Sequence, residues 1–228
     1  MAKIQKSKAY KYCEWVLQKD NQKAPSYVKK QCESWKRIAD GEDSEAYVSE
    51  KTYEKIMKLL GLMVHPDLQK PLNESLEDYA MLFITATFCT KTMDPDIDTE
   101  VRFYETALLK IARKNFKTFN AAVIFILLML TEPRFSRFFS VAPDLKLSKE
   151  LQIAIKKIIK SSPILSDELD PVFKTLRNEI RCNLTESEYT PLAYSEDKMD
   201  GKLPSAFLAD EAGAMDSYPV EAMRSGQI

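Results

Sequence analysis

The segment 111–118, with the sequence IARKNFKT, contains residue types that bind phosphate groups in many proteins. The ammonium group of Lys117 can pair with phosphate oxygens, and the hydroxyl of Thr118 is the hard oxygen ligand that Mg²⁺ prefers. A long apolar stretch follows directly, which predicts that the segment leads into a helix. Because the free N–H groups at a helix start attract anions, the segment predicts a phosphate-binding loop.

This loop departs from the usual phosphate-loop pattern G-x-x-x-x-G-K-[ST] at both glycines. Ile111 occupies the first glycine position and Phe116 the second. The backbone therefore loses easy access to positive φ and gains bulk beside the phosphates. Taken alone, the loop is better explained as a basic surface loop without a ligand. As a nucleotide site, its contact residues are predicted to be Arg113, Lys114, Asn115, Phe116, Lys117 and Thr118.

A second group of residues changes this balance. Asp210 and Glu211 directly follow the short apolar run Ala206–Ala209. An acid at the end of such a strand holds the Mg²⁺ shell in P-loop ATPases, and a neighbouring acid can polarise the attacking water. Two adjacent carboxylates repel each other and are costly to bury without a cation. Together with Lys117 and Thr118 they favour a site for ATP and Mg²⁺ over the alternative of an Asp-Glu pair in a surface turn.

The elements around these residues alternate between short apolar runs and helical patterns. Strands are predicted at Ala107–Ile111, Phe138–Ala142 and Ser205–Ala209, with further candidates at Phe173–Arg181 and Thr190–Ala193. Helices are predicted at Lys117–Leu130 and Ser148–Lys160, the latter with Ser148 as its N-cap. This alternation predicts an α/β fold of P-loop NTPase type, with a mostly parallel sheet flanked by helices.

The preceding residues predict a helical N-terminal region. Residues 1–37 contain two apolar stripes separated by Pro25, Ser49–Leu60 is amphipathic and Gly61 is placed to end it, and Leu76–Cys89 is a long apolar helix. Thr90–Thr99 reads as a turn-rich break. We expect a helical region at residues 1–75 and a P-loop core at residues 76–228.

Composition narrows the class of protein further. The net charge of -1 gives no general attraction to nucleic acid, although the first residues are basic and the last ones acidic. Four scattered cysteines and a single histidine, His65, argue against a disulfide scaffold and a Cys/His zinc site. His65 is expected to be structural or solvated. The longest apolar run, Ala121–Leu130, is too short to cross a bilayer, so a cytoplasmic protein without membrane contact is expected.

Four segments resemble the large terminase subunit of tailed bacteriophages. Its ATPase motif resembles Tyr104–Phe125, in which ARKN and KT match and Phe116 stands where Gly is usual. The segments FFSVAPD at Phe138–Asp144 and IIKSSP at Ile158–Pro163 are also similar. DGKLPSAFLADEAGA at Asp200–Ala214 resembles the motif of that family that carries the Asp-Glu pair.

This resemblance implies a motor that uses ATP hydrolysis to package viral double-stranded DNA into a capsid in the bacterial cytoplasm. Lys117 and Thr118 would bind phosphate and Mg²⁺, Asp210 would hold Mg²⁺, and Glu211 would be the catalytic base. Arg113 would steady or sense the γ-phosphate. The implied partners are the DNA, the portal protein and a small terminase subunit, with a homo-oligomeric ring formed by the full-length protein.

Two departures from the family leave alternatives open. An aromatic-Gln pair that recognises adenine corresponds here to Tyr79-Ala80, so Tyr79 is a candidate for stacking on the base, with packing in the core as the alternative. The chain ends at Ile228 without a nuclease segment, so DNA cleavage is not expected. The other hypotheses are a P-loop ATPase of another class, such as a switch or helicase-like protein, and a truncated or degenerate module that binds partners or nucleotide without hydrolysis.

Overall fold

The computed structural model describes residues 3–19, 21–112, 114–193 and 202–215, together with 221, 223 and 224. The chain forms two compact units, one made of Met1–Gly61 and Pro71–Ile111 and the other of Leu62–Lys70 and Ala112–Ile228. The predicted boundary after residue 75 lies inside the first unit and stays a prediction. Within the described ranges, no helix is long and apolar enough to cross a membrane.

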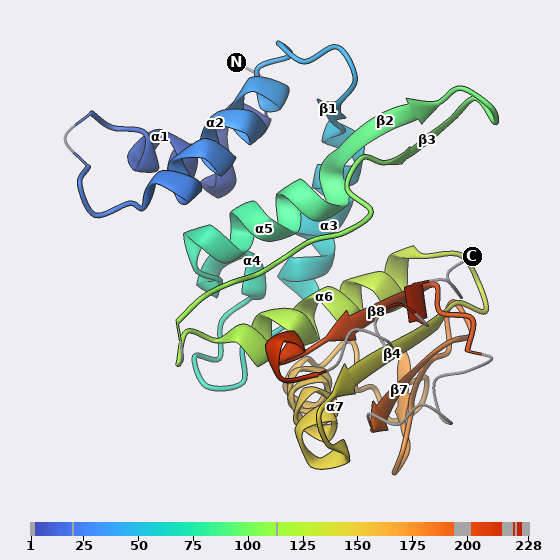
Figure 1. The fold of residues 1–228 in the computed structure, drawn as a ribbon. Helices are drawn as coiled ribbons and strands as arrows, with labels where there is room; N and C mark the ends of the chain where they lie inside the picture. Colours follow the sequence, from blue (N-terminus) through green and yellow to red (C-terminus); the bar gives the residue numbers. More distant parts are fainter. Residues whose placement is uncertain are drawn as a thin grey trace. The chain divides into compact units, whose positions relative to one another are not determined.

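Helices make up most of the first unit (Figure 1). They are η1 (Ile4–Lys6), α1 (Lys8–Val16), α2 (Ser26–Ala39), α3 (Glu50–Leu62), α4 (Leu72–Ser75) and α5 (Asp78–Cys89). Strands β1 (Tyr47–Val48), β2 (Thr90–Asp94) and β3 (Thr99–Arg102) form a small antiparallel sheet. Two predictions are wrong here. Gly61 lies within α3 and does not end it, and Thr90–Thr99 contains a strand and the start of its partner instead of a mere break.

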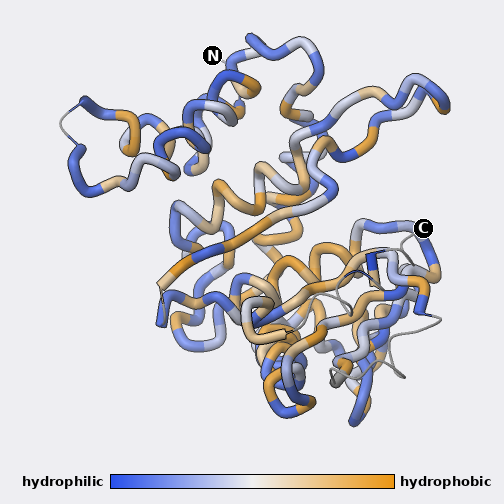
Figure 2. Tube along the Cα trace, in the orientation of Figure 1, coloured by the Kyte–Doolittle hydropathy of each residue, from blue (hydrophilic) through white to orange (hydrophobic). Residues whose placement is uncertain are grey.

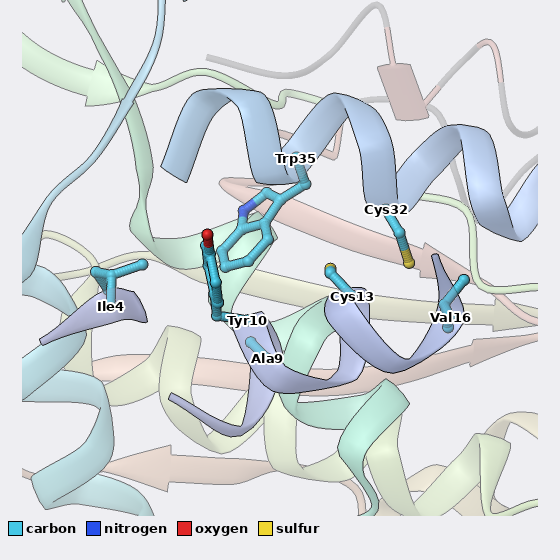
Figure 3. Close-up of a cluster of buried hydrophobic side chains, with 7 residues drawn as sticks. All are labelled: Ile4, Ala9, Tyr10, Cys13, Val16, Cys32 and Trp35. Atoms are coloured by element: carbon cyan, nitrogen blue, oxygen red, sulfur yellow. The ribbon is translucent and has the colours of Figure 1, made fainter. Parts of the chain in front are cut away.

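The apolar stripes of α1 and α2 face each other and form a core. Figure 3 shows its buried members, which are Ile4, Ala9, Tyr10, Cys13, Val16, Cys32 and Trp35. Trp35 also donates from its indole N–H to the hydroxyl of Thr90, at 3.2 Å, which satisfies the polar atom of a buried ring. Ser7 caps α1 by accepting a hydrogen bond from the backbone N–H of Tyr10.

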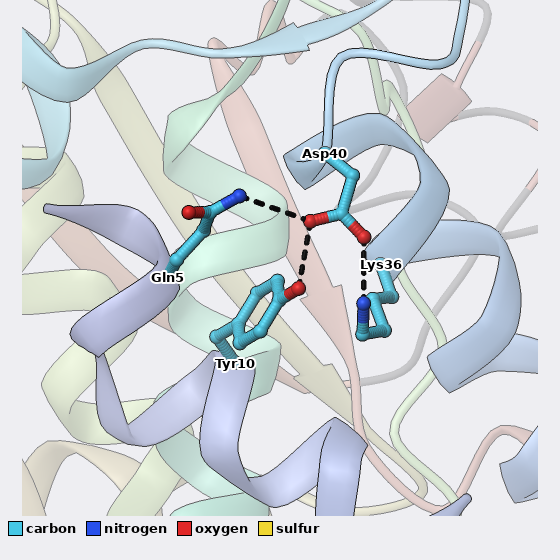
Figure 4. Close-up of polar contacts among 4 residues, drawn as sticks. All are labelled: Gln5, Tyr10, Lys36 and Asp40. Carbon is cyan, nitrogen blue, oxygen red and sulfur yellow. Dashed lines mark hydrogen bonds and ion pairs between the residues drawn. The ribbon is translucent and has the colours of Figure 1, made fainter. Parts of the chain in front are cut away.

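Asp40, at the end of α2, joins the two helices through a polar network (Figure 4). Its Oδ1 accepts from Tyr10 Oη at 2.7 Å and from Gln5 Nε2 at 3.2 Å, and its Oδ2 lies 2.6 Å from Lys36 Nζ. The Lys36 ammonium also lies over the ring of Tyr10, 4.6 Å from its centroid. Gln5 lies in η1, Tyr10 in α1 and Lys36 in α2, so the network links α1 to α2.

The second unit combines helices with one larger sheet (Figure 1). Its elements are α6 (Lys117–Thr131), β4 (Arg137–Ala142), α7 (Leu145–Ser161), β5 (Phe173–Thr175), β6 (Ile180–Cys182), β7 (Ser187–Ala193), β8 (Ala206–Ala209) and η2 (Ala212–Ala214). The strand order is β5-β6-β7-β4-β8. This arrangement confirms the α/β class.

The sheet is mixed: its centre is parallel, as predicted, but it also has an antiparallel edge that was not predicted. β4 runs parallel to both β7 and β8, whereas β5, β6 and β7 pair antiparallel. The predicted strand at 173–181 is in fact two strands, β5 and β6, joined by a tight turn. Because a tight turn can join only antiparallel strands, these short segments add an antiparallel edge to a parallel centre.

The predicted strand at Ala107–Ile111 is also absent, since these residues have no regular structure. The side chain of Leu108 is 85% exposed. A short apolar run becomes a strand only when a neighbour pairs with its backbone and covers its apolar face. The run therefore does not supply the sheet strand expected immediately before the phosphate-binding loop.

Helix α7 begins three residues earlier than predicted. Asp144 is its N-cap and accepts from the backbone N–H of Leu147 at 2.8 Å. Ser148, the predicted cap, is buried inside the helix, and its hydroxyl donates to the backbone oxygen of Ser140 at 2.9 Å. The Ser140 hydroxyl lies 2.6 Å from that of Tyr189. These hydroxyl groups link α7, β4 and β7 inside the unit.

The core of the second unit follows from the alternation of side chains along β4. On one face, Phe138 packs edge-on against Phe125 of α6, with ring centroids 6.4 Å apart. On the other face, Phe139 and Val141 form a buried cluster with Met223. Figure 2 shows α6 as a largely hydrophobic helix, in accord with its many buried residues. This burial holds the start of α6 in place beside the end of β8.

Candidate functional site

The loop before α6 contains two residues with positive φ. Phe116 is the N-cap of the helix and adopts a left-handed conformation, with φ 57° and ψ 26°. Lys114 also has positive φ, at 67°. Positive φ is strained for residues with a Cβ, and Phe116 occupies the position at which the usual pattern has Gly. Phe116 thus adopts a positive φ, which glycine adopts more easily than any other residue.

No side chain caps the start of α6. Phe116 has no acceptor atom, and the first turn of the helix contains no acidic residue. The Asn115 side chain instead donates to the backbone oxygen of Ala112, at 3.2 Å. The first turn of α6 thus supplies no acidic side chain of its own at the positive end of the helix dipole, which is a position where phosphate groups bind in proteins.

The predicted acidic pair lies directly against the predicted phosphate lysine. Lys117 Nζ is 2.8 Å from Asp210 Oδ1 and 2.7 Å from Glu211 Oε1. Asp210 is held at the end of β8 because its N–H donates to the backbone oxygen of Val141. Glu211 has a φ of 54°, a sharp change of direction that turns the chain away from the strand. The fold therefore brings together all three of these predicted residues.

Electrostatics stabilise the charged form of Lys117. Partial burial of its side chain disfavours the ammonium, but hydrogen bonds to Asp210 and Glu211 outweigh that effect and raise its pKa above the ordinary value. The Lys117 side chain is 37% exposed, so solvent screens these interactions. At neutral pH the lysine is a cation, as a phosphate-binding group must be.

For those of the other predicted site residues that the structure describes, it gives a position but no contact with the acidic pair. Thr118 is half-buried in the first turn of α6. Arg113 lies outside the described residues. Tyr79 is half-buried on α5 in the first unit, where its neighbour Ala80 is fully packed. Tyr79 as a base-stacking residue therefore stays a prediction.

Sequence reasoning missed the contribution of two residues near the loop. His65 is buried and its ring lies 4.6 Å from that of Phe119, which directly follows Thr118. Both line a cavity that also includes Phe116 and Thr118. The structural interpretation of His65 is supported, because its Nδ1 accepts the backbone N–H groups that follow it in the chain. No sequence signal indicated the cavity, since its walls come from three distant segments.

The residues present fit a magnesium ion better than a metal held by protein alone. Among the described residues, no group of three or more His, Cys, Asp or Glu side chains is arranged to hold a metal. Mg²⁺ needs fewer protein ligands, because it keeps several waters and takes oxygens from the phosphates of its substrate. The Thr118 hydroxyl and the Asp210 carboxylate are oxygen donors of the kind that such an ion uses.

Comparisons with known proteins identify a family and a similar fold. The family described as "Terminase large subunit, ATPase domain" matches residues 97–228, which is more than half of the chain. The fold resembles that of the large terminase of bacteriophage HK97, with a TM-score of 0.59 and 19% sequence identity. That match covers 76% of this chain and 34% of the terminase chain, so this chain spans about a third of that protein.

A search of curated proteins gave no match. The family match covers the loop, Lys117 and the Asp210-Glu211 pair, and the structural likeness independently supports the fold around them. The chain therefore belongs to the family of the terminase large subunit ATPase domain.

Proposed function

We propose that this chain binds ATP and Mg²⁺ at the loop before α6 and hydrolyses the nucleotide to drive the packaging of viral double-stranded DNA. The observation that carries the proposal is the position of Lys117 between Asp210 and Glu211, at 2.8 and 2.7 Å. A phosphate-binding cation and two acidic groups, supplied by distant segments, meet at the uncapped start of a long helix. Family membership supports ATP as the substrate.

Each side chain has a role in this proposal. Lys117 pairs with the phosphate oxygens, and Thr118 and Asp210 hold the metal, which neutralises charge that develops on the phosphates. Glu211 accepts a proton from the attacking water as the water oxygen bonds to the γ-phosphorus. The bond between that phosphorus and the bridging oxygen breaks, and ADP leaves. Arg113 steadies the γ-phosphate.

The partners in this proposal follow from the family. Double-stranded DNA is the translocated substrate, the portal protein is the docking site on the capsid, and a small terminase subunit recognises the genome. The full-length protein acts as a homo-oligomeric ring. The structural likeness to a phage terminase supports this setting through the fold.

A second function is favoured by one specific observation. Phe116 places a side chain that is 53% exposed at the position where the usual loop has Gly. Added bulk beside the phosphates can permit binding while displacing the γ-phosphate from Glu211. In that case the chain is a module that binds nucleotide or partners without hydrolysis.

Calorimetry separates these possibilities. The chain would be titrated with ATP in the presence of Mg²⁺, beside Lys117→Ala and the control Lys160→Ala, an exposed lysine at the end of α7. We expect Lys117→Ala to weaken binding at least about tenfold, as expected when a charge-assisted contact is lost. Unchanged affinity in that variant would contradict the phosphate-loop assignment. Binding without turnover by the unmodified chain would favour the second function.

A further inference from the structure

His65 lies in the segment Leu62–Lys70, which belongs to the second unit although the residues before and after it in the sequence belong to the first. The segment closes on itself, because the backbone N–H of His65 donates to the backbone oxygen of Lys70 at 2.9 Å. It is also joined to the end of α7, where the hydroxyl of Ser162 accepts from the backbone N–H of Val64 at 2.9 Å. These contacts give the segment a defined position within the second unit.

The side chain of His65 is held on two sides. Its Nδ1 accepts from the backbone N–H groups of Asp67 at 3.2 Å and Leu68 at 3.3 Å. The residue is only 6% exposed, and its ring lies 4.6 Å from the ring of Phe119, with the two planes tilted by 41°. Because the turn holds the imidazole through Nδ1, the ring cannot leave Phe119 without breaking these hydrogen bonds.

Phe119 is the third residue of α6 and directly follows Thr118. His65, Thr118 and Phe119 line the same cavity. The first turn of the helix is closed by a hydrogen bond from the backbone N–H of Asn120 to the backbone oxygen of Phe116, at 2.8 Å. Successive residues of one closed turn move together, so the position of Phe119 determines how the turn is rotated about the helix axis. The contact with His65 therefore determines where the Thr118 hydroxyl lies.

The two proposed ligand-binding residues of this turn differ in how well they tolerate a backbone shift. Lys117 carries its charge on a flexible four-carbon stem, which can adjust to a displaced backbone. The hydroxyl of Thr118 is attached to Cβ and moves with the backbone. Mg²⁺ requires near-ideal octahedral geometry, with ligands at about 2.0–2.1 Å. A shift of the first turn should therefore weaken metal binding more than phosphate binding.

We propose that His65 is a positioning residue for the magnesium site, and that it acts through the contact of its ring with Phe119. The inference rests on the proposed function and deepens it. It identifies a residue outside the loop, in the distant segment Leu62–Lys70, on which the metal-dependent part of nucleotide binding depends.

The test measures the affinity of the chain for ATP by calorimetry, once with saturating Mg²⁺ and once with EDTA. The ratio of the two affinities reports the contribution of the metal. His65→Asn removes the ring but keeps an oxygen that can accept from the N–H groups of the turn, as asparagine does in Asx turns. It should lower the ratio about three- to tenfold, the range of one aromatic contact, and leave the affinity in EDTA nearly unchanged.

His65→Phe is the reciprocal variant, because it keeps a ring against Phe119 and loses the acceptor atom. It should retain the ratio of the parent chain. An equal loss in His65→Phe and His65→Asn would assign the effect to the hydrogen bonds of the turn and overturn the role of the ring contact.

A double-mutant cycle tests the contact from its other side. Phe119→Leu should lower the ratio by about the same factor as His65→Asn. The double variant should bind no more weakly than either single variant, because both changes remove one contact. Effects that multiply in the double variant would overturn the inference. If His65→Asn does not fold, the decision rests on Phe119→Leu.

Ile180→Val is the control for a loss of stability alone, because Ile180 is buried in β6 and does not line the cavity that contains Thr118. It should lower the denaturation temperature and leave the ratio unchanged. A ratio lowered as much as in His65→Asn would overturn the inference, as would an unchanged ratio in both His65→Asn and Phe119→Leu. Failure of the parent chain to bind ATP, or equal affinity with Mg²⁺ and with EDTA, contradicts the proposed function itself.

Discussion

Lys117 Nζ lies 2.7 Å from Glu211 Oε1, although 94 residues separate them in the sequence. The contact joins the start of α6 to the residue that follows the end of β8 by two positions. It also gives the ammonium partners that a nucleotide would have to replace. In the proposed mechanism, a phosphate that pairs with Lys117 would release Glu211 to act on water, so the same contact would connect binding to catalysis.

Replacing Glu211 with Gln should separate binding from hydrolysis. The amide keeps the shape of the side chain but cannot accept the proton of the attacking water, so kcat should fall roughly 10²- to 10⁴-fold. ATP affinity should stay the same or rise, because the competing pair with Lys117 loses its charge. Phosphate release and calorimetry measure the two quantities.

Glu168→Gln is the matched control, because Glu168 is exposed in a loop remote from Lys117 in sequence. It should leave kcat unchanged. If Glu211→Gln turned over ATP at the parent rate, Glu211 would not be the base.

Phe116→Gly should increase stability. A non-glycine residue with φ 57° is strained by about 1 kcal/mol or more, and glycine removes this strain at some entropic cost in the unfolded chain. We expect the free energy of unfolding to rise by about 0.5–1 kcal/mol relative to Phe116→Ala, which removes the ring but keeps the Cβ. Urea denaturation of both variants measures the difference, and equal stabilities would show that the left-handed backbone is not strained.

The sequence was most informative where a single local rule determines the structure. Helix α6 was predicted at its correct start because the apolar stretch after Lys117 is long and has no breaker. The Asp210-Glu211 pair was predicted at a strand end because a short apolar run precedes it. The contact of Asp210 and Glu211 with Lys117 depends on the tertiary structure. The sequence suggested it only through the combination of residue types.

Predictions failed where pairing partners or caps decide the outcome. Ala107–Ile111 has the residues of a strand, but no strand among the described residues pairs with it and Leu108 is exposed. Ser148 has the residue type of a cap, but Asp144 lies earlier and takes that role. The cavity beside Phe119 depends on His65, which lies on a distant turn, so no local pattern reported it.

Asp40→Asn should remove part of the acid sensitivity of the fold. Partial burial opposes the carboxylate, but hydrogen bonds from Lys36, Tyr10 and Gln5 outweigh it, and the pKa of Asp40 lies below its ordinary value of 3.8. A carboxylate with a depressed pKa stabilises the fold at pH values above its ordinary pKa. This contribution is lost as the pH falls through the pKa of the folded state. The variant should lose about 1–3 kcal/mol at pH 7 and show a flatter dependence below pH 4.

The control for Asp40 is Glu54→Gln, which breaks an exposed ion pair with Lys3. Exposed pairs contribute little, so this change should leave the free energy of unfolding nearly unchanged. Urea denaturation at several pH values measures both variants. Parallel pH profiles for the parent chain and Asp40→Asn would show that the network in Figure 4 does not respond to acid.

Tyr189→Phe tests the buried hydroxyl cluster that joins β7 to β4 and α7. The Tyr189 hydroxyl is 2.6 Å from that of Ser140 and is inaccessible to solvent, and burial raises the pKa of the phenol. Removing the hydroxyl should cost about 1 kcal/mol, because Ser140 keeps its second partner, the hydroxyl of Ser148 at 3.0 Å. Tyr27→Phe, on an exposed ring, should change stability by less than about 0.5 kcal/mol.

A double-mutant cycle with Ser140→Ala isolates this contact. The two changes should be non-additive by at least about 0.5 kcal/mol, since both remove the same hydrogen bond. Additive effects would mean that the hydroxyl of Ser140 depends on its hydrogen bond with Ser148 and gains nothing from Tyr189. The register of the centre of the sheet would then depend on the packing of Tyr189 against Phe125, whose ring centroid lies 5.2 Å away, and not on its hydroxyl.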